Sequence, residues 1–156
     1  MKDTDLNAFA LPGGFIGVNA GLVTATANES ELAGVLAHEI AHVTQRHLAR
    51  SIAAQSKNAT ISAIGMLAAI LIGAASGSGD AIQGAVAVSQ GVAAQQRLNY
   101  SRANEAEADR VGMGVLAASG FDPNGMGTFF ETLGRQTTLG ASRVPEFLLT
   151  HPVTSN

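Results

Sequence analysis

Two histidines and a glutamate within five residues are the strongest chemical signal in the sequence. The segment reads His38-Glu39-Ile40-Ala41-His42, and the apolar spacing around it predicts a helix. Positions four apart lie on one face of a helix, so His38 and His42 can both reach one ion at about 2.0–2.1 Å. Glu39 then points to the flank of this pair, where it can hold a metal-bound water. The pattern predicts a site for a divalent metal ion.

A catalytic zinc needs a third protein ligand, and a later acidic segment offers one. Residues 104–109 read Asn-Glu-Ala-Glu-Ala-Asp, which places Glu105 and Asp109 four apart on one helix face. In this interpretation Glu105 ligates the metal and Asp109 accepts a hydrogen bond from the free N–H of a ligand histidine. The alternative is a solvated acidic helix face near Arg102 and Arg110. Beside the histidine pair, we favour the metal site.

The helix that carries the histidine pair has a clear start signal. Asn28 is a good N-cap residue and Glu31 follows three positions later, as in a capping box. Apolar residues then recur at a core-facing spacing, and we expect the helix to run to about residue 56. In one continuous helix His47, five residues after His42, is rotated off the ligand face, so we expect it to face solvent.

The rest of the chain is predicted to be β at its start and helical afterwards. Residues 6–24 read as β, with a turn at 12–14, and helices are expected over about 104–119 and 123–138. A chain of 156 residues is long enough for one compact domain. The sequence therefore predicts a single, mostly helical α+β domain over residues 1–156.

An Ala/Gly/Ile/Ser-rich block occupies residues 59–96. Its apolar run at 61–75 is shorter than the roughly 18–20 residues of a membrane span and contains glycines, with a further break at 77–79. We favour a buried or lid-forming helical hairpin here. A peripheral contact with a membrane or with an outer-membrane assembly is the alternative.

Composition and charge exclude several other kinds of site. There are nine Lys and Arg residues and the net charge is −3, which argues against a nucleic-acid partner. With no cysteine, any metal must be bound by histidines and carboxylates. Residues 1–5 are polar and form no signal peptide, and residues 153–156 carry no helix or strand signal, so we expect a piece of a longer chain.

The motif His38-Glu39-Ile40-Ala41-His42, followed by Glu105-Ala106-Glu107-Ala108-Asp109, resembles metallopeptidase family forty-eight. That family includes the HtpX, BepA, LoiP and Oma-type proteases and the CAAX prenyl proteases. Several flanking segments match as well, so that the resemblance covers nearly the whole chain: residues 8–14, 101–102, 120–123 and 150–152. The absence of several membrane spans makes the chain more similar to the soluble bacterial periplasmic branch.

The resemblance implies a gluzincin-like metalloprotease fold, with a small β-hairpin edging the active-site helix. It implies one Zn²⁺ per chain, with His38, His42 and Glu105 as ligands. Glu39 would be the general base and Asp109 the partner behind a ligand histidine. A periplasmic location and a role in envelope protein quality control also follow from the resemblance.

His151 is a further candidate through the same resemblance. In the resembling proteins this histidine approaches the metal, either as a removable fourth ligand that blocks water or as a partner for the developing oxyanion. A simple surface histidine is the alternative. We carry His151 as a catalytic residue together with Glu39.

Two main functions follow. The first is a zinc-dependent endopeptidase that hydrolyses internal peptide bonds of misfolded or stalled envelope proteins, using zinc-activated water and Glu39 as general base. Its substrate would pair with an edge strand in the region 6–18. The alternative is a latent or structural-zinc module that grips unfolded clients through residues 59–96 and acts as a chaperone. A structural helical protein with a chance motif would bind no stoichiometric metal.

Overall fold

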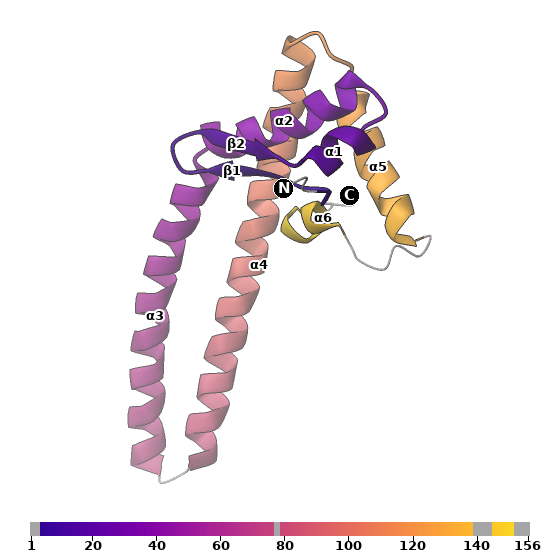
Figure 1. Cartoon of the computed structure of the whole chain (residues 1–156). Helices are drawn as coiled ribbons and strands as arrows, with labels where there is room; N and C mark the ends of the chain where they lie inside the picture. The colour runs from indigo at the N-terminus through magenta and orange to yellow at the C-terminus, as the bar shows by residue number, and fades with distance from the viewer. Residues whose placement is uncertain (1–3, 77–78, 139–144, 152–156) are drawn as a thin grey trace. The chain divides into compact units, whose positions relative to one another are not determined.

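The computed structural model describes residues 4–76, 79–138 and 145–151 (Figure 1). The chain is mostly helical with one small two-stranded antiparallel sheet, which confirms the predicted fold class. It divides into two compact units, Met1–His47 with Arg102–Asn156, and Leu48–Ser101. The elements in chain order are β1 (Ala8–Leu11), β2 (Phe15–Val18), α1 (Ala20–Ala25), α2 (Glu29–Thr44), α3 (His47–Ser76), α4 (Gly79–Ala118), α5 (Asn124–Thr138) and α6 (Glu146–Thr150).

The N-terminal segment forms the predicted hairpin but only part of the predicted β region. β1 pairs with β2 in a register that runs from Ala8 opposite Val18 to Leu11 opposite Phe15. Residues 20–25, expected to be β, form the helix α1 instead. A short apolar run does not distinguish strand from helix by its periodicity, and here Leu22 is fully buried in the core. The β prediction was therefore wrong beyond residue 18.

The start of α2 is as predicted, but its end is not. The Asn28 side chain accepts a hydrogen bond from the Glu31 amide at 3.0 Å, which caps the first turn. The helix stops at Thr44 rather than near residue 56. Arg46 has a φ of 55°, in the left-handed region, and the chain resumes a helix at His47. A non-glycine residue rarely adopts this conformation, so the sequence carries no signal for the break.

The core of the first unit lies around α2, which packs against β1 and α5. Glycines make the crossing of α2 and α5 close: a Cβ on Gly34 would lie 2.8 Å from the Met126 Cα, and one on Gly125 would lie 2.5 Å from the Ser30 carbonyl. α5 spans nearly the predicted residues 123–138. The fully buried members of the main cluster are Ala8, Leu22, Val35, Phe129, Leu133 and Phe147.

α4 also approaches α2 closely, at the position of the histidine pair. A Cβ on Gly112 would lie 3.1 Å from both the Cα and the N of His38. Glu105 and Asp109 stand seven and three residues before Gly112, so all three share one face of α4. The helix predicted over 104–119 is the C-terminal part of α4, which begins at Gly79 because the alanine-rich segment before residue 104 favours helix.

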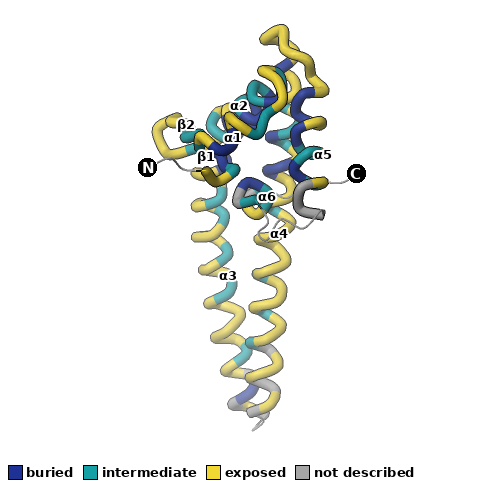
Figure 2. Tube along the Cα trace, turned by 45° about the vertical axis from the view of Figure 1, so that its right-hand side comes forward, coloured by how far each residue is buried: buried dark blue, intermediate teal, exposed yellow. Residues whose placement is uncertain are grey.

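The second unit consists of the remaining parts of α3 and α4, which run side by side (Figures 1 and 2). Most of its described residues are exposed, including Ile61, Ile64, Leu67 and Leu71. The prediction of a buried hairpin was therefore wrong, while a lid role stays a prediction. The predicted break at 77–79 falls mostly outside the described residues, as do residues 153–156. No helix in the described part of the chain has the length and hydropathy of a membrane span.

We predict opposite effects of one substitution at two glycines of α4. Gly112→Ala should lower the free energy of unfolding by about 1–2 kcal/mol, because its new methyl group meets the His38 backbone. Gly114→Ala, the matched control, meets nothing within 4 Å and should raise it by up to about 1 kcal/mol through helix propensity. Urea denaturation followed by circular dichroism measures both. Equal shifts in the two variants would show that α2 and α4 do not approach closely at this point.

Candidate metal centre

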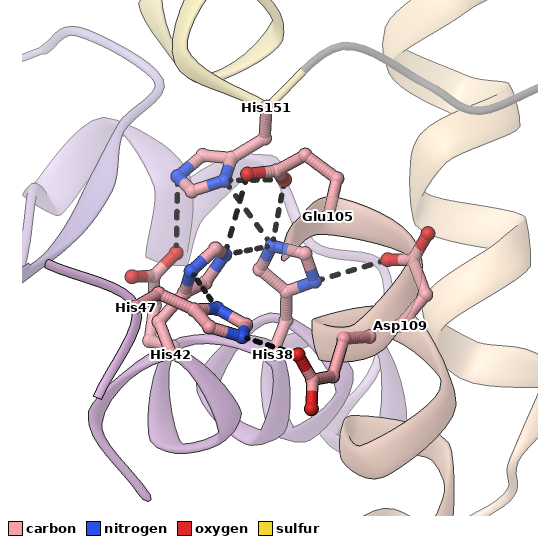
Figure 3. Close-up of polar contacts among 8 residues, drawn as sticks. His38, His42, His47, Glu105, Asp109 and His151 are labelled. Carbon is pink, nitrogen blue, oxygen red and sulfur yellow. Dashed lines mark hydrogen bonds and ion pairs between the residues drawn. The ribbon is translucent and has the colours of Figure 1, made fainter. Parts of the chain in front are cut away.

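Four side chains converge on one point in the first unit (Figure 3). α2 contributes His38 and His42, α4 contributes Glu105, and His151 follows directly after α6. One potential ligand atom from each lies within 4.8 Å of all the others. The structure therefore brings together residues that are up to 113 positions apart in the chain.

The separations between these atoms fit a tetrahedral metal site. Bonds of about 2.0–2.1 Å place the ligand atoms of a tetrahedral zinc about 3.3 Å from one another. The Nε2 atoms of His38 and His42 are 2.9 Å apart. Glu105 lies 3.3 Å from His38 Nε2 through Oε2 and 3.6 Å from His42 Nε2 through Oε1. Imidazoles with a carboxylate suit zinc and several other divalent ions, so these residues fit a metal.

His151 completes the group as a fourth donor. Its Nδ1 lies 3.1 Å from His38 Nε2 and 2.9 Å from Glu105 Oε2. Buried Phe147 on α6 holds it there, with the ring centroids 4.8 Å apart, and the His151 amide donates to the Phe147 carbonyl at 2.8 Å. The Phe147 amide in turn donates to the Leu6 carbonyl, which anchors α6 to the N-terminal segment.

Both histidines of α2 have a polar partner behind the ring. His38 Nδ1 lies 3.0 Å from Asp109 Oδ1, the arrangement that the spacing of Glu105 and Asp109 predicts. His42 Nδ1 lies 2.8 Å from Nδ1 of His47. His47 is only 3% exposed, so its predicted orientation toward solvent was wrong.

The break at Arg46 explains why His47 is buried. On a continuous helix, five residues rotate the side chain by about 140° away from His42. The left-handed Arg46 redirects the backbone, and the first residue of α3 returns to the back of the His42 ring. Its other ring nitrogen, Nε2, lies 3.3 Å from Glu107 Oε2. Sequence periodicity could identify neither His47 nor Glu107 as part of the site.

Glu39 lies beside the group of donors without belonging to it. Its side chain is 1% exposed, and its Oε1 is buried without a hydrogen-bond partner among the described residues. Glu39 Oε1 lies 3.3 Å from His151 Nε2. Burial raises the pKa of the Glu39 carboxyl more than the neighbouring imidazoles lower it. A carboxylate with a raised pKa next to a metal site is suited to accept a proton from water.

The buried charges of this group compensate one another. Burial by itself would lower the pKa of His38, but contacts with Asp109 and Glu105 outweigh it and raise the pKa to about 9. Burial would likewise raise the pKa of Glu105, but hydrogen bonds from His151, His38 and His42 hold it well below its ordinary value. A proton on His38 thus balances the negative charge of Glu105.

A mostly helical domain in which two helices bring imidazoles and a carboxylate to one point, beside a buried glutamate, has the architecture of a metallopeptidase. The profile of Peptidase family M48 matches residues 1–156. The chain therefore belongs to this family of metallopeptidases.

Individual relatives agree with the family. The chain is 44% identical over 155 residues to the β-barrel assembly-enhancing protease of Escherichia coli (strain K12), covering 98% of this chain and 31% of that protein. The protein of the same name from Yersinia pestis is 43% identical, with the same coverage. The mitochondrial metalloendopeptidase OMA1 of Arabidopsis thaliana is 33% identical over 152 residues, which are 97% of this chain and 28% of that protein. The chain thus spans less than a third of these relatives.

We predict that the metal-free protein loses stability as the pH rises from 6.5 to about 9. The folded pKa of His38 exceeds its unfolded value, so its contribution is complete below the unfolded pKa and disappears as pH passes the folded pKa. The loss should be up to about 3 kcal/mol, measured by urea unfolding in the presence of a chelator. His38→Gln should flatten the profile. A stability that is constant or rises over this range in the wild type would contradict the prediction.

Proposed function

We propose that this chain is the catalytic part of a zinc-dependent endopeptidase, which hydrolyses internal peptide bonds of misfolded or stalled envelope proteins. We further propose that residues 1–156 act as one metallopeptidase domain. His38, His42 and Glu105 hold the ion, Asp109 fixes the ring of His38, and Glu39 is the general base. The proposal is supported by the family match over residues 1–156 and by the four-donor group.

The observation that carries the proposal is the position of Glu39. A carboxylate that only stabilised the fold would be expected to satisfy its buried oxygens by hydrogen bonds. Glu39 Oε1 is instead buried and makes no hydrogen bond among the described residues; it has only a longer contact of 3.3 Å with His151 Nε2, a member of the four-donor group. A carboxylate oxygen that makes no hydrogen bond at this position is suited to accept one from a water molecule that is to be deprotonated.

The reaction follows from the chemistry of these residues. A bound divalent ion polarises a carbonyl group and lowers the pKa of water. Glu39 accepts a proton from the attacking water as the new C–O bond forms at the peptide carbonyl. It then returns this proton to the leaving nitrogen as the C–N bond breaks. The fixed position of Glu39 on α2, one residue after His38, keeps the base beside the reacting atoms.

Substrate binding is proposed to use the small sheet. In a two-stranded sheet, each strand has one edge whose backbone groups are not paired within the sheet. An extended substrate segment can add to such an edge through backbone hydrogen bonds, which select little for sequence. Low selectivity suits clients that are recognised because they are unfolded.

The envelope context is inferred from the relatives. Two of them are named β-barrel assembly-enhancing proteases. From these names we propose that the present chain is periplasmic and that it contacts the outer-membrane assembly machinery. The apolar side chains exposed on the second unit, such as Ile61, Leu67 and Leu71, are proposed to make that contact or one with the membrane surface.

A second candidate is a latent or chaperone-like module with structural zinc. It is favoured by one observation, the fourth donor His151 within the group. Four protein ligands are typical of structural zinc, whereas a catalytic zinc keeps one position for water. The two candidates differ in whether His151 leaves the site.

We expect Glu39→Gln to retain stoichiometric zinc but to lose nearly all casein hydrolysis, by on the order of 10²–10⁴-fold, because the amide cannot accept the proton. Metal analysis and a casein assay on the same preparation provide the measurement. Glu131→Gln, at an exposed glutamate of α5, is the control and should behave like the wild type. A Glu39→Gln variant that cleaves casein normally would remove Glu39 from the mechanism, and wild-type protein without metal would refute the metallopeptidase proposal.

His151→Ala distinguishes the two roles of His151, whose Nδ1 lies 3.1 Å from His38 Nε2 and 2.9 Å from Glu105 Oε2. Casein hydrolysis should increase in this variant if His151 is a removable fourth ligand that blocks water. Lower activity with zinc still bound would instead assign His151 to the stabilisation of the oxyanion. If the wild type and the variant both bind zinc and both are inert, the chaperone-like module is the better assignment.

A further inference from the structure

We propose that His47 and Glu107 form a positioning pair that fixes the ring of the ligand histidine His42. This inference rests on the metal site of the proposed function and adds two residues to it. Neither residue is a metal ligand. They act through His42, as Asp109 is proposed to act through His38.

In the first unit, three side chains follow one another in contact: His42, His47 and Glu107 (Figure 3). His42 directs Nε2 toward the other donors, 2.9 Å from His38 Nε2, and its opposite nitrogen Nδ1 lies 2.8 Å from His47 Nδ1. His47 Nε2 then lies 3.3 Å from Glu107 Oε2. The His47 side chain is 4% exposed and that of Glu107 is 26% exposed, so the line runs from the metal-binding group toward the surface.

The protons in this line have only one arrangement when a metal is bound. A neutral imidazole that coordinates through Nε2 carries its proton on Nδ1, so His42 Nδ1 is a donor. His47 Nδ1 must then accept, which places the proton of neutral His47 on Nε2, where it is donated to the Glu107 carboxylate. Each hydrogen-bond donor in this line therefore faces an acceptor. This arrangement fixes the tautomer of His42.

The two ligand histidines of α2 are thus held in different ways. His38 has a carboxylate directly behind it, with Asp109 Oδ1 at 3.0 Å. His42 has its carboxylate one imidazole further away. The space behind His42 is filled by the first residue of α3 because Arg46 breaks the helix there. A histidine that only filled this space would need no contact with the back nitrogen of a ligand.

The first test compares His47→Leu with His47→Asn, two side chains of similar shape. Leucine removes the acceptor, so zinc should be bound about 10–100-fold more weakly, as found for losses of such partners. The asparagine Oδ1 can stand near the former Nδ1 position and accept from His42, so this variant should retain most of the affinity. Competition of the full chain with a chelator for zinc gives the affinities without an activity assay. Equal weakening in both variants would refute a hydrogen-bonding role.

The second test changes Glu107, which is partly exposed and thus easier to replace without loss of the fold. Glu107→Leu should weaken zinc binding, by less than His47→Leu does, while Glu107→Gln keeps an acceptor and should lie close to the wild type. Glu131→Leu, at an exposed glutamate that lies in an ion pair with Arg135, is the matched control and should leave the affinity unchanged. An affinity of Glu107→Leu equal to that of the control would remove Glu107 from the pair.

The third test needs no substitution. In the zinc-loaded wild type, ¹⁵N NMR of the imidazoles should show the proton of His42 on Nδ1 and that of His47 on Nε2. A proton on His47 Nδ1 would overturn the inference, because that nitrogen could not accept from His42. The proposed function fails separately, if the wild type binds no zinc or hydrolyses no protein. Unchanged zinc affinity in His47→Leu would refute only the positioning pair.

Discussion

The architecture of the first unit depends on one electrostatic constraint: a buried carboxylate and three imidazoles face one another and need a positive charge between them. The ligand atoms of His38, His42, Glu105 and His151 lie within 4.8 Å of one another and are largely removed from water. Such a group is costly to bury unless a proton or a metal ion compensates it. Contacts with Asp109 and Glu105 raise the pKa of His38, so that a proton on this ring can compensate the carboxylate, and a divalent ion can take over the same role.

Close packing of helices brings these donors together. α4 reaches the His38 backbone at Gly112, and α5 reaches α2 at Gly34 and Gly125, where any larger residue would meet backbone atoms. The small residues that make up much of this sequence therefore contribute to the site indirectly. They let the helix backbones approach closely, so that the few functional side chains can contact one another across the helices.

The candidate metal ligands and the exposed apolar residues belong to different units of the chain. All donors and the residues behind them lie in Met1–His47 and Arg102–Asn156, whereas Leu48–Ser101 exposes isoleucine and leucine side chains along two long helices. The exposed apolar side chains of the second unit therefore contribute no atom to the four-donor group.

Much of the site could be predicted from local spacing, because residues four apart on a helix share a face whatever surrounds them. This applies to His38 and His42, to Glu105 and Asp109, and to the Asn28 cap. The family was identifiable from the same residues.

Tertiary structure decided what depends on backbone direction and on distant contacts: the left-handed Arg46 that returns His47 to His42, the burial of Leu22 in a helix, and the Phe147 contact that places His151 beside Glu105. No periodic pattern encodes a single unusual φ angle or a contact between opposite ends of the chain, so these features emerge only when the chain is folded.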